Sequence, residues 1–277
     1  MKKSNHIFGK IIKYSSLVIG VLIALVPIIV VLFASLKTSE EMARTGALSL
    51  PENWFNFENY TRAFVEGDML KGFFNTFIIL FVAILGSIII GSMIAYVLSR
   101  FKFRGSNIIM GAFLFAVLIP GVTTQVATFQ IINSLGLFNT RGAAIILFMG
   151  TDIIAVYIFL QFLNRISESL DESAMLDGAS YLTIYTKIIL PLLKPAIATV
   201  FIIKGLTIYN DFYIPFLYMP KDGLQVVSTA LFKFIGPYGS QWEIISALII
   251  IAIIPTLIVF LSLQKYIYNG FTQGAVK

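Results

Sequence analysis

The sequence predicts an all-α integral membrane protein with six transmembrane helices and both termini in the cytoplasm. Its 277 residues are 58% hydrophobic and only 12% charged, whereas soluble domains carry about 25% charged residues. Six long runs contain few or no charges, and each can cross the hydrocarbon core as a helix of about 20 residues. The distribution of lysine and arginine between these runs sets the orientation.

The six expected spans form a single transmembrane domain over residues 1–277. They cover residues 14–36, 72–99, 106–128, 142–163, 196–218 and 244–264. The uncharged run 105–140 is too long for one helix, so we expect the third span to end near Pro120 and an amphipathic external segment to follow. In the second span Ser87, Gly91 and Ala95 fall four residues apart, which favours close packing within the chain over a subunit interface.

Positive charges lie mainly on the side of the membrane that holds the N-terminus. With that end inside, twelve lysines and arginines lie in cytoplasmic segments and seven in external ones, as the positive-inside rule requires. We therefore attribute the net charge of +6 to cytoplasmic loops rather than to a nucleic-acid-binding face. The first apolar run is too long for the core of a signal peptide, so we expect it to remain as a helix.

The sequence lacks the residues of several common kinds of catalytic site. It has no cysteine, and its single histidine, His6, lies in the N-terminal tail, which excludes a Ser-His-Asp or Cys-His site and a His/Cys metal cluster within the fold. The Gly-x4-Gly-Lys-Ser/Thr loop that cradles nucleotide phosphates is also absent. We expect the chain to be no enzyme, to carry no metal or cofactor of its own, and to draw energy from another chain.

The external segment 37–71 is rich in aromatic residues. It contains Trp54, Phe55, Phe57 and Tyr60, and aromatic side chains of this kind collect at the level of the lipid headgroups. We expect this segment to lie at the membrane surface.

The cytoplasmic segment 164–194 is too long for a plain connector between two spans and is expected to fold. Ser169 and Glu172 have the spacing of a capping box, which predicts a helix that begins at Leu170. Gly178 supplies the left-handed conformation that ends such a helix.

A second short helix is expected directly after Gly178. Ser180 is its expected cap, the helix runs from Tyr181 to about Ile189, and Pro191 closes it. A helix that lies on the inner leaflet normally has a lysine-rich polar face, whereas the first of these two helices is acidic. This favours a protein partner for the pair. The acidic residues are Asp171, Glu172 and Asp177.

One pattern in this segment resembles a known family. The residues Glu172-Ser-Ala174-x3-Gly178-x9-Ile188-x-Leu190-Pro191 resemble the EAA loop of bacterial ABC importer permeases, the cytoplasmic element that docks in a cleft on the ATP-hydrolysing subunit. Other stretches resemble the carbohydrate branch, in particular the shorter permease of the maltose-transporter type. They are Arg100-Phe-Lys-Phe-Arg-Gly105, Asn210-Asp211-Phe212, 264–266 and 270–276. Ser173 replaces the usual alanine, and Lys204 is not expected from the family pattern.

The resemblance implies a permease that imports sugars or oligosaccharides across the bacterial plasma (inner) membrane. It implies a heterodimer with a second homologous permease, two ATPase subunits that bind ATP and Mg, and an extracellular or periplasmic sugar-binding protein. The residues that it assigns to coupling with the ATPase are Glu172, Ala174, Asp177, Gly178, Ile188, Leu190 and Pro191.

The fifth span contains the candidate substrate contacts. An ionised carboxylate near the centre of a span costs about 2.5 to 3.5 kcal/mol on insertion scales, so Asp211 is expected to face a polar cavity or a partner. Carboxylates, amides and aromatic rings suit sugars, which makes Tyr209, Asn210, Asp211 and Tyr213 candidates for the substrate pathway. Alternatively, Asn210 and Asp211 only bind neighbouring helices or the partner permease. Lys204 is expected to extend its ammonium toward the inner interface.

Three alternatives stay open at this point. The first is an ABC permease for another solute, such as a glycerol phosphate or a sugar acid. The second is a subunit of an ion-coupled secondary transporter, in which Asp152 and Asp211 would be coupling sites. The third is an intramembrane enzyme, which the separation of these two carboxylates on different spans disfavours.

Overall fold

The computed structural model describes residues 2–46, 48–101, 103–150, 152–237 and 239–275. The side chains of residues 1–9, 11 and 263–277 lie outside this description. The side chains of the sequence features noted at His6, 264–266 and 270–275 therefore lie outside this description, as does residue 276 altogether. The chain divides into two compact units, Met1–Met69 with Ala230–Pro255 and Leu70–Thr229 with Thr256–Lys277.

The first unit contains helices and one small hairpin. Its elements are α1 (Lys2–Leu36), α2 (Ser39–Arg44), α3 (Glu58–Glu66), η3 (Ala230–Phe234), β1 (Ile235–Gly236), β2 (Gly239–Ser240) and the first half of α14 (Trp242–Ala275). The two strands pair antiparallel, with Ile235 opposite Ser240. The Asn59 amide of α3 donates to the carbonyls of Ser35 and Lys37, at 2.9 and 2.7 Å, and so ties α3 to the end of α1.

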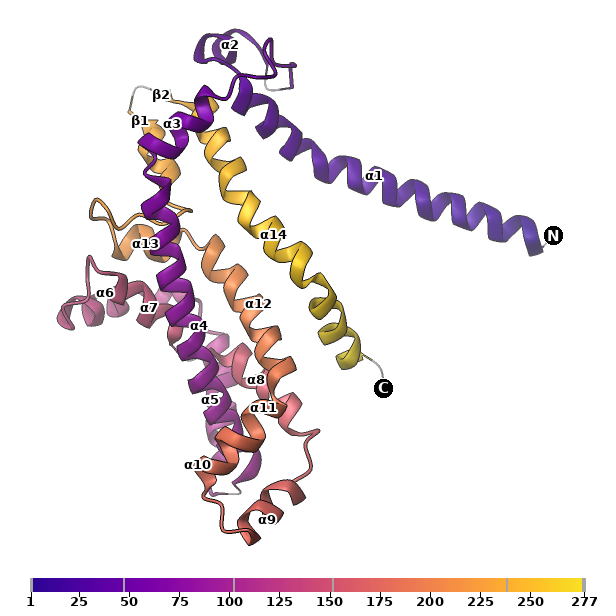
Figure 1. The fold of residues 1–277 in the computed structure, drawn as a ribbon, viewed down its shortest axis with the longest axis vertical. Coiled ribbons are helices and arrows are strands. Elements are labelled where there is room, and N and C mark those ends of the chain that lie inside the picture. The colour runs from indigo at the N-terminus through magenta and orange to yellow at the C-terminus, as the bar shows by residue number, and fades with distance from the viewer. Residues whose placement is uncertain (1, 47, 102, 151, 238, 276–277) are drawn as a thin grey trace. The chain divides into compact units, whose positions relative to one another are not determined.

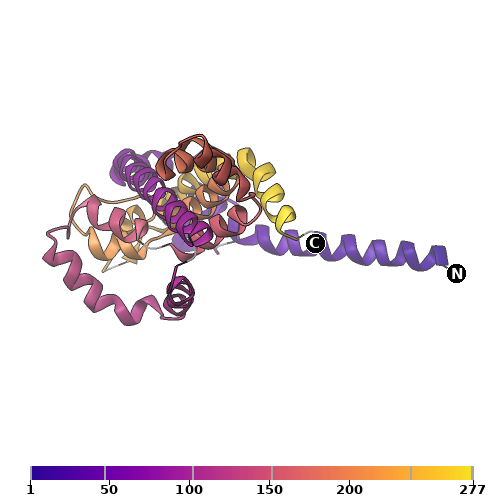
Figure 2. The same ribbon diagram turned by 90° about the horizontal axis from the view of Figure 1, so that it is seen from below.

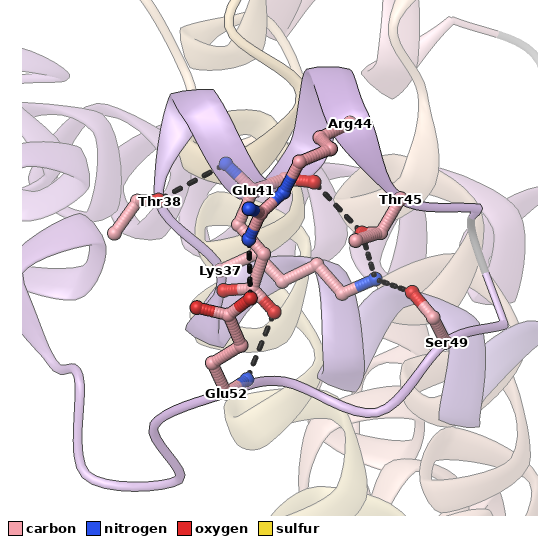
Figure 3. Close-up of polar contacts among 7 residues, drawn as sticks. All are labelled: Lys37, Thr38, Glu41, Arg44, Thr45, Ser49 and Glu52. Atoms are coloured by element: carbon pink, nitrogen blue, oxygen red, sulfur yellow. Dashed lines mark hydrogen bonds and ion pairs between the residues drawn. The ribbon is translucent and has the colours of Figure 1, made fainter.

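Lys37 anchors the loop that follows α1. Its side chain is completely buried, and its ammonium donates to Thr45 Oγ1 at 3.2 Å and to Ser49 Oγ at 2.6 Å (Figure 3). It also donates to the Gly46 carbonyl at 2.9 Å. All three ammonium hydrogens therefore have acceptors, which offsets the cost of burying the charge.

Glu41 secures the same loop on its other side. Its carboxylate accepts the Glu52 N–H at 2.8 Å, and its own N–H donates to Thr38 Oγ1, the cap of α2, at 3.1 Å. Arg44 and Glu52 form an exposed ion pair beside it (Figure 3). The aromatic side chains Trp54, Phe55 and Phe57 farther along are exposed; that they lie at the membrane surface stays a prediction.

The second unit is built from helices. They are α4 (Met69–Arg100, whose first residue belongs to the first unit), α5 (Ser106–Val117), η1 (Gly121–Thr124), α6 (Gln125–Ser134), α7 (Arg141–Met149), α8 (Ile153–Leu163), α9 (Ser169–Leu176), α10 (Tyr181–Ile184), the π-helix η2 (Tyr185–Ile189), α11 (Leu190–Leu192), α12 (Lys194–Asn210), α13 (Tyr213–Tyr218) and the second half of α14. Within this unit α9 and α10 lie at one end and α13 lies toward the other (Figure 1).

Three helices among the described residues are long and apolar enough to cross a membrane, and the number rises to six if each bent pair of helices counts as one span. The three are Ile12–Leu36 of α1, α4, and Trp242–Ser262 of α14. The bent pairs are α5 with η1 and α6, α7 with α8, and the segment Tyr181–Leu192 with α12.

The third expected span differs from a straight helix over 106–128. The chain bends by 96° between Val117 and Gly121, and α5 and α6 run in different directions in Figure 2. Pro120 explains the break, because a proline has no N–H for the preceding turn and disfavours helical geometry in the residue before it. The fourth expected span is likewise divided, after Gly150, into α7 and α8.

The core of the second unit packs α4 against α8 and the segment that leads into α12. Ser87 and Ala95 of α4 are buried, and a Cβ added at Gly91 would lie 3.5 Å from Ala155 Cβ and from the Phe159 ring. The small residues spaced four apart therefore let α8 of the same chain approach closely, as expected.

Candidate functional site

The segment between α8 and α12 begins with a helix that differs in its cap from the expectation. The N–H groups of Asp171 and Glu172 donate to the Glu168 carbonyl, at 3.0 and 3.1 Å, so α9 begins at Ser169 and Glu168 is its cap. The expected capping box of Ser169 and Glu172 is therefore wrong. Because the helix begins one residue earlier than expected, the Ser169 N–H belongs to the first turn and has no carbonyl partner within the helix. It donates instead to Ser167 Oγ at 3.3 Å.

The end of α9 follows the sequence expectation. Gly178 has φ +81°, and its N–H donates to the Met175 carbonyl at 3.0 Å while Ala179 N–H donates to the Ala174 carbonyl at 3.0 Å. This is the left-handed helix end that glycine allows. Ser180 then caps α10 and accepts the Thr183 N–H at 3.3 Å.

The second helix does not end at Pro191. It continues through η2 and α11 to Leu192 and then turns by 72° into α12. The Leu190 N–H donates to the Tyr185 carbonyl, five residues back, so a wider π-turn precedes the proline and shifts the hydrogen-bond register by one residue. Pro191 thus falls in the first turn of α11, where the missing N–H is tolerated.

A buried ion pair holds α9 against α4. Arg100 Nε lies 2.7 Å from Asp171 Oδ2, and the two side chains are 7% and 8% exposed. The Tyr96 hydroxyl donates to Asp171 Oδ1 at 3.3 Å, and Arg100 Nη2 donates to the Ile166 carbonyl at 2.9 Å. Asp171 therefore faces inward, whereas the sequence suggested only an acidic helix. Asp171 lies three residues before Ala174, which is buried, so the two share a face of α9. This spacing could have indicated from the sequence that Asp171 is buried too.

The opposite face of this segment is exposed and mixed in character. Among the residues that the sequence assigned to coupling, Glu172, Asp177, Gly178 and Pro191 are exposed, Ala174 is buried, and Ile188 and Leu190 are half-buried. Large apolar side chains lie beside the acidic ones. They are Leu170, Met175, Leu176, Tyr181 and Leu182, with Leu176 90% exposed. Such a patch is typical of a protein interaction surface.

The candidate substrate residues surround the end of α12. Asn210 Nδ2 donates to the Leu206 carbonyl at 2.9 Å, and Asp211 Oδ1 accepts the Ile214 N–H at 2.8 Å. Because Pro215 lacks the N–H that would continue the helix, the Asp211 carbonyl is free to accept the Ser228 hydroxyl, at 2.7 Å. Asp211 thus links α12 and α13.

Tyr213 lies apart from Tyr209. The Tyr209 hydroxyl bonds to Thr256 of α14, whereas Tyr213 borders a cavity of about 330 Å³. The polar side chains around this cavity also include Gln125, Thr128 and Tyr218, two of which belong to α6. No local pattern in the sequence indicates these α6 residues, because their approach depends on the bend at Pro120.

Lys204 forms an ion pair that the sequence did not predict. Its Nζ lies 3.0 Å from Asp152 Oδ2, so the expectation that the ammonium extends to the inner interface is wrong. Asp152 is the cap of α8, and the division of α7 from α8 brings its carboxylate beside α12. The pair borders a cavity of about 180 Å³.

The apolar helices, the broken spans and the exposed segment around α9 are compatible with a transport component of a membrane. The chain belongs to the family of binding-protein-dependent transport system inner membrane components, whose model matches residues 87–273. The family favours transport over the intramembrane enzyme among the alternatives weighed from the sequence.

Two relatives match almost end to end. The arabinooligosaccharides transport system permease protein AraQ of Bacillus subtilis (strain 168) is 32% identical over 92% of this chain and 92% of its own length. The probable starch degradation products transport system permease protein AmyC of Thermoanaerobacterium thermosulfurigenes is 34% identical over 96% of this chain and 97% of its own.

A solved structure has the same fold. In the crystal structure of a bacterial ABC transporter involved in the import of the acidic polysaccharide alginate, one chain matches with a TM-score of 0.82 and 25% identity, over 95% of this chain and 97% of that chain.

Proposed function

We propose that this chain is the permease subunit of an ATP-driven importer for sugars or oligosaccharides. The observation that carries the proposal is the full-length similarity to permeases named for arabinooligosaccharides and starch degradation products. The chain would form the translocation pathway with a second homologous permease and receive its solute from an extracellular or periplasmic binding protein. Both termini would lie in the cytoplasm, as the distribution of positive charges favours.

The segment from α9 to α11 would couple this pathway to two ATPase subunits, which bind ATP and Mg. Two features support this role. Leu176 and its apolar neighbours are exposed beside Glu172 and Asp177, and the buried Arg100–Asp171 pair ties the same helix to α4. A movement of α9 caused by the ATPase subunit would therefore be transmitted to the membrane-spanning helix α4 through the Arg100–Asp171 ion pair.

The cavity beside Tyr213 is the proposed outer contact for the sugar. Phenolic rings cover the apolar C–H face of a sugar ring, while Gln125 and Thr128 offer hydrogen bonds to its hydroxyls. The volume of about 330 Å³ is at the lower end of the range of small-molecule sites. Asn210 and Asp211 would line the pathway next to it.

A single-cysteine experiment tests the coupling and the orientation together, because the natural chain has no cysteine. Leu176→Cys in the assembled complex should cross-link to a cysteine placed in the cleft of the ATPase subunit and resist a membrane-impermeant maleimide added outside. Phe55→Cys, whose natural side chain is 82% exposed, is the matched control and should be labelled from outside without cross-linking. The reverse pattern would reject the proposal.

A further inference from the structure

We infer that Asp152, Lys204 and Thr207 form an inner pocket for one ring of a neutral, hydroxyl-rich sugar. The inference rests on the proposed function and adds to it a second contact, deeper than the one beside Tyr213, and a charge preference. The three side chains border the same cavity between α8 and α12.

The pair is open to this cavity and is not sealed in a core. Asp152 Oδ1 accepts the Ala155 N–H at 3.2 Å and Oδ2 lies 3.0 Å from Lys204 Nζ, while the two side chains remain 14% and 16% exposed. An ammonium has three donor hydrogens and a carboxylate accepts about four hydrogen bonds. Both groups therefore keep unused capacity on the side that faces the cavity.

A purely structural role explains the pair poorly. The contact of α8 with α12 is already built from buried apolar side chains, among them Val156, Phe159 and Val200. Ionisable residues within membrane-spanning segments are costly, and they mark solute or ion pathways. The most direct explanation for the Asp152–Lys204 pair is therefore that it binds a solute that enters the cavity.

The pocket lies along α12, before the candidate substrate residues at the end of this helix. Lys204 and Thr207 are three residues apart and lie on one face of α12, and Asp211, the residue at which the helix ends, follows Thr207 by four residues. The Thr207 hydroxyl donates to the Ile203 carbonyl at 2.9 Å, so its oxygen remains free to accept from a ligand. A sugar leaving the outer contact would meet hydrogen-bonding groups at each turn of this face.

The chemistry of the pocket selects a neutral ligand. Lys204 and Asp152 carry opposite charges 3.0 Å apart, so the pocket has no net charge and favours neither an anion nor a cation. Ile154, Ile158 and Ile203 supply an apolar wall for the C–H face of a ring. A cavity of about 150 Å³ accommodates benzene, so about 180 Å³ accepts one six-membered ring.

Transport of paired substrates by the reconstituted complex tests this inference. Asp152→Asn keeps the shape and leaves the Lys204 charge uncompensated, so kcat/KM for an oligosaccharide that contains uronic acid should rise by at least about tenfold relative to its neutral counterpart. Lys204→Gln should shift the ratio in the opposite direction. An equal change for both substrates, or no change, would overturn the inference and indicate a structural pair.

Two further variants keep the test decisive if a single charge change prevents assembly. The double variant Asp152→Asn/Lys204→Met removes both charges and should leave the ratio of acidic to neutral transport as in the wild type. Thr207→Val should lower the apparent affinity for the neutral substrate, and an unchanged affinity would count against the pocket. Failure of the wild-type complex to transport either oligosaccharide would instead reject the proposed function.

Discussion

Removing the Asp171 carboxylate should detach α9 from the membrane-spanning part of the second unit. In Asp171→Ala, Arg100 loses its partner at 2.7 Å and Tyr96 loses its acceptor at 3.3 Å. Among the described residues, Arg100 keeps its contacts with the Ile166 carbonyl and with Ser99. The variant therefore leaves an uncompensated guanidinium where the side chain is 7% exposed.

The magnitude follows from this burial. Removing one partner of a buried ion pair costs about 3 to 5 kcal/mol, most of which is the penalty of the unpaired charge. Since about 1.4 kcal/mol corresponds to a factor of ten, the detached state of α9 should become roughly two to three and a half orders of magnitude more populated. The loss falls on the coupling segment rather than on the helices that cross the membrane.

Hydrogen exchange of the assembled complex measures the effect directly. Amides in residues 166–178 should exchange faster in Asp171→Ala, and Ser173→Ala, at an exposed position on the same helix, should exchange like the wild type. The double variant Arg100→Met/Asp171→Leu removes both charges and should recover most of the protection. Wild-type exchange in Asp171→Ala would refute the reasoning.

Two other changes have defined outcomes. Gly178→Pro should abolish uptake without preventing membrane insertion, because proline cannot adopt φ +81° and removes the N–H that bonds to Met175. Sugar uptake by the inserted variant measures this, and the control Ser173→Ala should transport normally. Normal uptake by Gly178→Pro would contradict the coupling role. Lys37→Met should destabilise the loop after α1 by about 1 to 3 kcal/mol, because it removes the hydrogen bonds from the charged ammonium to Thr45, Gly46 and Ser49. Thermal unfolding should show a lower midpoint than for Lys221→Met, at an exposed position. Equal midpoints would refute this.

Local signals in the sequence sufficed where a single residue determines the backbone. Gly178 ended a helix and Ser180 began the next one as expected, because each acts through its own conformation or its own hydroxyl group. The apolar runs likewise located the helices, since a helix in lipid must be apolar over most of its length. The start of α9 was less certain, because Glu168 and Ser169 compete for the cap position one residue apart.

Contacts between residues far apart in the chain could not be predicted from the sequence. Asp152 and Lys204 meet only because the chain breaks after Gly150 and packs α8 against α12. The Arg100–Asp171 pair similarly depends on where α9 folds back on α4. Periodicity predicts which residues share a face of one helix, but not which two helices place their charged residues together.

The most direct test of the central claim is oligosaccharide uptake into proteoliposomes that contain the complete complex. A permease that is driven by partner ATPase subunits should accumulate the sugar only with ATP on the ATPase side, should be inhibited by vanadate, and should be indifferent to an uncoupler. Uptake that persists without ATP and stops when the uncoupler dissipates the ion gradient would contradict the account, because the chain would then be driven as a secondary transporter.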